Sequence, residues 1–370
     1  MVLETFSKRD GPGAKHHQDA PGSIAEKNRP LTIEDASGEI ELLMNNINGL
    51  EDKLNALLEQ EAIQDGDVHL VEQRQQRQKI EKVLREAVDV KIMETLRARH
   101  DCRTPDEHTS EEERLDAYSP RNQVMTVEVA RGDDTKPLPA IFKPRKGEAV
   151  WVEKDGITGI NETRPQTGYL REWLAGMIAK SFDSEVVPPT VIGQIDGIIG
   201  SIQLKVEAKP ACLAVGESWL AVAKVKDLRD VAVLDILVHN TDRHDANFLV
   251  GDDGTVWAID HGLTFPESRF DRGIKSFPLR HFSAGDRVLP EPLLGRLANM
   301  IEDQRRYQII KEAFNLVFGL ARGNVFFGEF EKRIRELVKT GEFPDYRMYP
   351  NDEKYFWGHA ATVIKRKHAP

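Results

Sequence analysis

Three polar side chains flank a short predicted hairpin, and their types are those that bind metal ions and accept protons. The stretch "VHNTDRHDANFLVGDDGTVWAIDHG" (residues 238–262) contains "FLV" and "VWAI", which predict two strands, with "GDDG" as the tight turn between them. Asp242 and Asn247 precede the first strand, and Asp260 ends the second. The hairpin should therefore bring all three side chains to one end.

These three residues predict phosphoryl transfer. Asp242 and Asn247 are separated by four residues, which is the D-x-x-x-x-N spacing of a phosphotransferase catalytic loop. Asp242 would orient an acceptor hydroxyl and accept its proton, while Asn247 and Asp260 supply hard oxygen ligands that suit Mg²⁺. This chemistry needs in-line positioning and charge stabilisation, with little covalent participation by the protein. We therefore expect ATP and Mg²⁺ as cofactors.

Two upstream residues complete the predicted constellation. Lys143 lies in "AIFKPRKGE", a predicted strand, from which a lysine can contact the α- and β-phosphates of ATP. Such a lysine needs a carboxylate to hold it, and Glu172 in the following predicted helix is the candidate. Each residue alone is more often structural. The four elements in this order are far more specific, and they favour catalysis.

The histidines of this stretch leave more than one role open. His244 could donate a hydrogen bond to the transferring phosphate or assist proton transfer, and it could equally pack under the loop and fix it. Arg243 is expected to hold the loop. His244 and Asp245, with His239 and His261, also allow a metal-dependent phosphohydrolase. That rival is disfavoured because no upstream helical histidine offers a partner.

The elements around these residues predict an α+β protein with a small sheet-rich lobe followed by a larger helical lobe. Strands are expected at residues 123–130 and 139–144, with two more within 189–208, and a helix at 168–182. After residue 211 the pattern is mainly helical.

The N-terminal third has a different character. Residues 1–30 are rich in Gly, Pro, Lys, His and Asp and predict a disordered tail. Residues 31–100 predict an antiparallel helical hairpin, with a coiled-coil-like apolar seam in its first helix and a second helix from about residue 68 to 98. We expect the hairpin to pack or to mediate protein–protein contact. Residues 101–118 are polar and predict a linker.

Composition limits the classes of function. The chain has 370 residues and a net charge of −10, so a nucleic-acid partner has no global electrostatic support. Its two cysteines, Cys102 and Cys212, indicate neither a disulfide framework nor a zinc site. No apolar run is long enough to cross a bilayer, and the N-terminus lacks a secretory pattern. A cytoplasmic protein is expected, with specialised secretion left open.

Several segments resemble the phosphatidylinositol 3-/4-kinase superfamily, and most closely its type II phosphatidylinositol 4-kinase branch. They are, in order, "IFKP", "GYLREWLAG", "VPPT", "GSIQLKVEA", "LDILVHNTDRHDAN" and "AIDHGLTFP". The resemblance covers roughly residues 139–285 and implies a bilobal protein-kinase-like fold. It implies a small lobe at 119–210, a larger lobe at 211–346 and a C-terminal tail at 347–370.

The resemblance also implies roles for individual residues. Lys143 would contact ATP phosphates and pair with Glu172, and the strand from Gln203 to Val206 would form the hinge against adenine. Asp242 would be the catalytic aspartate, with metal ligands at Asn247 and Asp260. The acceptor would be a hydroxyl of a phosphoinositide or a protein, with peripheral membrane contact a possibility.

Two departures keep a pseudokinase or interaction module as the alternative. The phosphate-covering stretch "AYSPRN" (117–122) has no glycine, and His261 stands where many kinases carry Phe. The cysteine-rich segment of the type II lipid kinases is also absent, which weakens the inference of a lipid substrate more than that of a kinase. The segment after Asp260 supplies basic residues that suit an anionic head group, an acidic peptide or, most simply, a solvated loop. These residues are Arg269, Arg272, Lys275, Arg280 and His281.

Overall fold

The computed structural model describes most of the chain between residues 33 and 344. Contacts within the chain divide it into two compact units, Met1–Leu42 and Leu43–Pro370. The fold described below is that of the second unit. The predicted disordered tail, the linker at 101–118, the stretch at 117–122 and the C-terminal tail lie outside the described residues. No helix in the described part is long and apolar enough to span a membrane. The described ranges are 33–87, 89–96, 124–132, 136–147, 167–211, 222–266, 274, 276–283 and 285–344.

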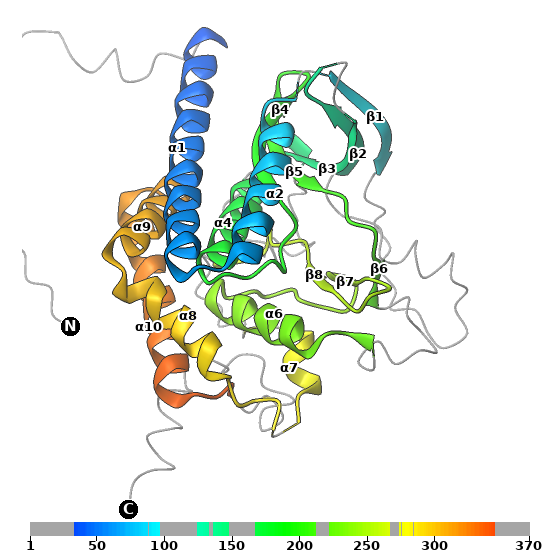
Figure 1. Ribbon diagram of the computed structural model, residues 1–370. Helices are drawn as coiled ribbons and strands as arrows, with labels where there is room; N and C mark the ends of the chain where they lie inside the picture. The colour runs from blue at the N-terminus through cyan, green and yellow to red at the C-terminus, as the bar shows by residue number, and fades with distance from the viewer. Residues whose placement is uncertain are drawn as a thin grey trace, which may run out of the picture. The chain divides into compact units, whose positions relative to one another are not determined.

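The small lobe is built on a five-stranded antiparallel sheet in the order β1-β2-β3-β5-β4 (Figure 1). In β3, buried and partly exposed residues alternate, so one face carries the core and the other faces outward. Asp196 and Gly197 both have positive φ, 51° and 72°, which is the backbone of a type I′ hairpin turn between β4 and β5. The strands are β1 (Asp89–Leu96), β2 (Val124–Ala130), β3 (Leu138–Pro144), β4 (Thr190–Ile195) and β5 (Ile198–Leu204).

The predicted helical hairpin is present, but its second helix is shorter than expected. α1 (Ile33–Asp65) and α2 (Val68–Arg85) run antiparallel (Figure 1), and the Asp67 side chain caps α2 by accepting from the Leu70 amide at 2.9 Å. The prediction of helix as far as residue 98 was wrong, because residues 89–96 form β1 and pair with β2. Only the first half of the sequence there, "DVKI", alternates, and the pairing is irregular between Ile92 and Glu94. Pairing with a neighbouring strand outweighs the helical propensity of this stretch.

The hairpin shares its core with the small lobe. Leu84 of α2 is fully buried in the same apolar cluster as Phe142 of β3 and Ile202 of β5. α1 buries one face between residues 47 and 62, including Leu54 at 0 % exposure. The expected seam of α1 therefore packs against the lobes of the protein.

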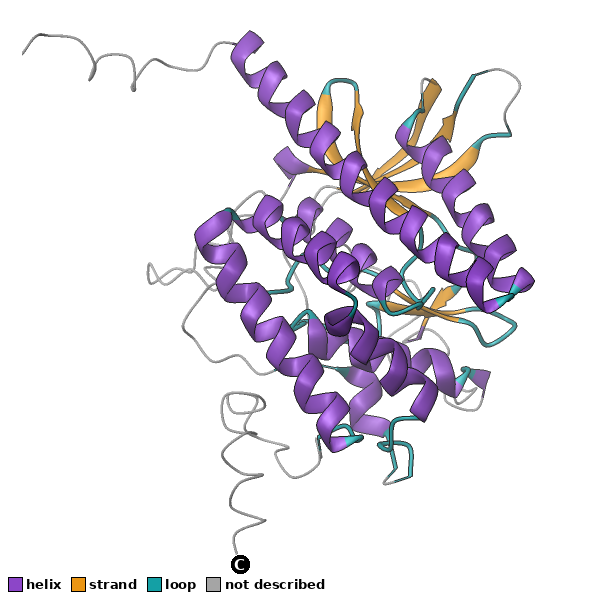
Figure 2. Ribbon diagram, turned by 60° about the vertical axis from the view of Figure 1, so that its left-hand side comes forward, coloured by secondary structure: helices purple, strands orange, loops and turns teal. Residues whose placement is uncertain are grey.

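α4 (Gly168–Ser181) confirms the helix predicted between the second and third predicted strands of the small lobe, and it is buried from Tyr169 to Ser181. It contacts β4 and β5 on one side and α6 and α9 on others. Because α4 is buried on all sides, its position is determined by its contacts with the sheet and with the surrounding helices. Figure 2 shows how closely helices cluster below the sheet.

The larger lobe is mainly helical and confirms the bilobal kinase-like α+β arrangement. A small sheet, in the order β6-β7-β8, carries the predicted hairpin. Phe314 lies at the centre of an aromatic cluster with Phe265, Phe318, Phe327 and Phe330. The remaining elements are η2 (Arg145–Gly147), β6 (Lys209–Pro210), α6 (Val225–Leu237), β7 (Phe248–Val250), β8 (Val256–Ala258), α7 (Phe277–His281), α8 (Glu291–Glu302), α9 (Gln304–Phe318) and α10 (Leu320–Thr340).

Candidate active site

The loop that carries Asp242 is held from beneath by a fully buried ion pair. Nε of Arg243 lies 2.9 Å from Oδ1 of Asp235 in α6, and both side chains are 0 % exposed. Arg243 also donates to the backbone carbonyls of Asn247 and Ile259. The expectation that Arg243 holds the loop is confirmed. Sequence reasoning missed Asp235, although a lone carboxylate inside the apolar run "VLDILV" could have drawn attention to it.

Asn247 is oriented so that its amide oxygen is available. Its Nδ2 donates to the carbonyl of Asp242 at 2.9 Å, which assigns the nitrogen and leaves Oδ1 as the ligand oxygen. The residue is 7 % exposed, so its rotamer is well fixed. The Asp242 side chain, by contrast, is 39 % exposed and accessible to an acceptor.

The predicted hairpin places Asp260 beside these two residues. β7 pairs with β8 in antiparallel register, and the Ile259 amide donates to the carbonyl of Asn247 at 3.1 Å. Asp260 follows in the left-handed region with φ of 58°, a conformation that costs a non-glycine residue energy and is common at functional sites. Its side chain is 48 % exposed.

Lys143 joins the two lobes. Its Nζ lies 2.5 Å from Oε1 of Glu172 and 3.1 Å from Oδ1 of Asp260. Burial lowers the pKa of Lys143, but the adjacent carboxylates outweigh burial and hold that pKa above its ordinary value. Burial likewise raises the pKa of Glu172, yet the charge of Lys143 and the hydrogen bond with His261 hold it well below the usual range. The structure thus brings Lys143, Glu172 and Asp260 together, whereas the sequence grouped them only by their order along the chain.

His261 has a partner that the sequence did not indicate. The ring is 0 % exposed, and its Nδ1 lies 3.3 Å from Oε2 of Glu172. Burial lowers the pKa of His261 despite the carboxylate, which favours the neutral ring. Nδ1 then donates to Glu172, and the buried Nε2 has no hydrogen-bond partner among the described residues. The residue after Asp260 therefore helps to hold the carboxylate that pairs with Lys143.

His244 combines features of both predicted roles. Its Nδ1 accepts from the backbone amide of Ala246 at 3.2 Å, so the ring contributes to the turn. That bond places the proton of the neutral ring on Nε2, which lies 4.0 Å from Oδ2 of Asp242. The side chain is 42 % exposed and is therefore not packed under the loop.

The two predicted adenine-hinge residues lie at the end of β5. The Gln203 side chain is buried and donates to Oγ1 of Thr190 on β4 at 2.8 Å, so it ties two strands together. Val206 follows β5, and its carbonyl accepts from the Ala208 amide at 3.1 Å. Their predicted role against adenine depends on the backbone and stays a prediction.

The oxygen donors present fit a hard divalent cation. Asn247 Oδ1 and the Asp260 carboxylate are hard ligands, and a nucleotide-bound Mg²⁺ takes its remaining ligands from phosphates and water. Within the described ranges, no three His, Cys, Asp or Glu side chains gather as a metal cluster. Those residues thus offer no histidine-rich site of the kind the phosphohydrolase alternative requires.

The basic segment after Asp260 is described only in part. Arg269, Arg272 and Lys275 lie outside the described residues. Arg280 and His281 end α7, and the His281 ring packs against Phe277 at an interplanar angle of 49°, with ring centroids 4.5 Å apart. The Phe277 amide donates to the carbonyl of Arg243, which ties α7 to the loop of Asp242.

Comparison with known families finds similarity in the part of the chain that carries these residues. Residues 214–290, which contain Asp242, Asn247 and Asp260, match the family "Phosphatidylinositol 3- and 4-kinase". "Phosphatidylinositol 4-kinase gamma 4" of Oryza sativa subsp. japonica is 36 % identical over 155 residues, which is 35 % of this chain. The chain spans about a quarter, 27 %, of that curated relative.

These matches show that part of this chain is similar to the phosphatidylinositol 3-/4-kinase superfamily, in agreement with the resemblance of its sequence motifs. The type II branch stays a prediction. Among solved structures, "Crystal structure of A Helicobacter pylori proinflammatory kinase CtkA" covers 61 % of this chain and 90 % of its own. Its TM-score is 0.34 and its identity 12 %, which are too low to transfer anything from that kinase to this chain.

Proposed function

We propose that this protein is an ATP- and Mg²⁺-dependent phosphotransferase that moves the γ-phosphate of ATP to a hydroxyl acceptor. The observation that carries the proposal is the network in which Lys143 contacts Glu172 and Asp260, across 29 and 117 residues of sequence. Phosphoryl transfer in protein kinases requires a Lys–Glu ion pair and a Mg²⁺-binding aspartate, and Lys143, Glu172 and Asp260 are the residues that would supply them. A merely structural surface lysine would have no need of two acidic partners from different lobes.

Each residue then has a task. Lys143 would contact the α- and β-phosphates, and Glu172 would hold it in position. Asn247 and Asp260 would bind Mg²⁺, which supplies charge neutralisation when bound. Asp242 would orient the acceptor hydroxyl and accept its proton, and His244 would donate its Nε2 proton toward the transferring phosphate.

A phosphoinositide is the acceptor that we propose first. The family description and the name of the curated relative, which is a phosphatidylinositol 4-kinase, support this choice. A protein acceptor is the alternative, because one fold serves several acceptors and only the site can decide between them.

The deciding experiment offers γ-labelled ATP and Mg²⁺ to the full chain, with phosphoinositide vesicles in one tube and a protein lysate in another. Asp242→Ala is the matched inactive control, and omission of Mg²⁺ is the second. Label that reaches lipid and is lost in the variant supports lipid kinase activity. Label that reaches only protein indicates that the acceptor is a protein. Binding of MgATP without variant-sensitive transfer in either tube favours the pseudokinase alternative.

A further inference from the structure

The α1–α2 hairpin contacts α4, a helix on which the proposed active site depends. α4 carries Glu172, whose carboxylate must lie against Lys143. Trp173 and Lys180 are seven residues apart, so they share one face of α4, about a quarter-turn from Glu172. That face is bound by α1 and α2, and both contacts are made by buried polar groups.

The first contact joins α4 to α1. Nε1 of Trp173 donates to Oε1 of Glu51 at 2.5 Å, and the exposed fractions of the two residues are 1 % each. The other carboxylate oxygen of Glu51 is bound by Arg85 of α2. Burial raises the pKa of Glu51, and the nearby Glu81 raises it further. A buried carboxylate of this kind needs the hydrogen bond from Trp173 and the charge of Arg85.

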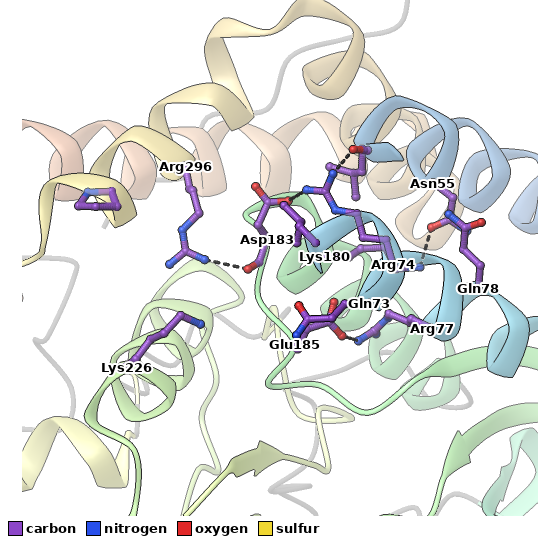
Figure 3. A pocket seen from close by; sticks show the side chains of 13 residues that line it. Asn55, Gln73, Arg74, Arg77, Gln78, Lys180, Asp183, Glu185, Lys226 and Arg296 are labelled. Carbon is purple, nitrogen blue, oxygen red and sulfur yellow. Dashed lines mark hydrogen bonds and ion pairs between the residues drawn. The ribbon is translucent and has the colours of Figure 1, made fainter. Parts of the chain in front are cut away.

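The second contact joins α4 to both helices of the hairpin. Nζ of Lys180 lies 2.8 Å from Oε1 of Glu81 on α2 and donates to Oδ1 of Asn55 on α1 at 3.1 Å. Glu81 is also bound by Arg77, at 3.0 Å. Lys180, Arg77 and Asn55 line a pocket of about 380 Å³ at the end of α4 (Figure 3).

The segment that follows α4 is bound by the same hairpin. Arg74 of α2 lies 2.5 Å from Oδ1 of Asp183, and Arg77 lies 2.5 Å from Oε2 of Glu185. Figure 3 shows these pairs beside Lys180 on the pocket wall. The C-terminal end of α4 is therefore fixed by several charged contacts, whereas its N-terminal half carries Glu172.

We infer that the α1–α2 hairpin holds α4 at the position in which Glu172 pairs with Lys143, and that Trp173 and Lys180 are positioning residues for that pair. The inference rests on the proposed function, because it names what keeps the phosphate-binding lysine in place. A displacement of about 1 Å is enough to disrupt a constellation of this kind. The hairpin is thus an internal support of the active site, built into the same chain.

The test uses the full chain with Lys180→Met and, separately, Trp173→Phe, each of which removes one contact to the hairpin. Lys180→Met leaves Glu81 paired with Arg77, so the variant keeps most of the buried cluster. Lys180→Arg keeps the charge and should restore the wild-type behaviour. The matched control is Gln75→Ala, which removes the exposed bond from Gln75 to Glu59 between α2 and α1 and touches no residue of α4.

The first readout does not need ATP. The rate at which acetic anhydride labels Lys143 is followed by mass spectrometry, with Glu172→Gln as the reference for a lysine that has lost its partner on α4 and exposed Lys332 as the internal standard. Loss of a hydrogen bond to a charged group changes an equilibrium constant by about tenfold. Lys180→Met and Trp173→Phe should therefore raise Lys143 labelling several-fold and leave Lys332 unchanged.

The second readout is the affinity for MgATP by calorimetry, in single variants and combined with Glu172→Gln. If the hairpin acts through Glu172, its variants weaken binding in the wild-type background and add nothing once Glu172 is replaced. A purely structural role would lower the unfolding midpoint without changing Lys143 labelling at lower temperature, and that result overturns the inference. If the wild-type chain binds no MgATP, the proposed function fails, while the labelling rates still decide the positioning role.

Discussion

Nδ1 of His261 lies 3.3 Å from Oε2 of Glu172, so the residue next to the proposed metal ligand Asp260 binds the carboxylate that pairs with Lys143. One oxygen of Glu172 faces the lysine and the other faces the imidazole. The position of Glu172 is therefore determined from the larger lobe as well as from α4. A ring of the same size without a nitrogen could pack there but could not donate this bond.

His261→Phe should weaken MgATP binding with little loss of stability. The hydrogen bond to a charged carboxylate is worth about 1.5–3 kcal/mol, which predicts roughly a tenfold or greater rise in the dissociation constant for MgATP. Within the part of the chain that the structure describes, the buried Nε2 has no hydrogen-bond partner, and the replacement removes this atom, which offsets part of the cost to folding. Calorimetric titration and thermal unfolding measure the two effects separately. Unchanged affinity would mean that Glu172 is held by α4 alone.

Asp242→Asn should abolish transfer while leaving nucleotide binding intact. Asp242 is proposed as the base that accepts the proton of the acceptor hydroxyl, so its loss should lower the rate of label transfer by about 10²–10⁴-fold. Asp252→Asn, at the exposed tip of the β7–β8 turn, removes the same charge nearby and should not alter the rate. Equal rates for Asp242→Asn and wild type would refute the assignment of the base.

Asp235→Ala should destabilise the larger lobe. It leaves Arg243 buried without its carboxylate, a change that costs about 3–5 kcal/mol. Denaturant unfolding should show a large fall in the free energy of unfolding. The comparison variant is Asp253→Asn, which breaks the surface pair with Lys224 and should leave the midpoint almost unchanged, because water screens that pair. Similar effects of the two variants would argue against the supporting role of Arg243.

The contribution of Glu172 to stability should depend on pH in a defined direction. Burial raises the pKa of Glu172, but Lys143 and His261 outweigh it, so the folded state has the lower pKa. A carboxylate of this kind stabilises the fold fully above its ordinary value of 4.5, and the stabilisation is lost as pH falls toward the lower folded value.

The wild type should therefore exceed Glu172→Gln in free energy of unfolding most clearly above that value. The difference should shrink in acid, and urea titrations between about pH 3 and about pH 7 measure it. A difference that does not change with pH would show that the pair contributes through packing alone.

Local patterns were sufficient to predict most elements and the order of the site residues. Alternating apolar residues indicated β2, turns at glycines separated β4 from β5, and the turn residues of "GDDG" indicated the β7–β8 hairpin. The spacing of Asp242, Asn247 and Asp260 was sufficient to predict phosphoryl transfer, because a short hairpin brings the residues at its two ends close together. These features depend on neighbours in sequence, which is why the sequence alone determined them.

Tertiary packing decided what local patterns could not. Residues 89–96 became a strand because β2 was available to pair with them. The contact between His261 and Glu172 joins residues 89 positions apart, and that between Trp173 and Glu51 joins residues 122 positions apart. Buried polar groups must find partners wherever the fold places them, so their pairing follows from the three-dimensional arrangement of helices and sheet. Only that arrangement revealed that the N-terminal hairpin supports the helix of the proposed active site.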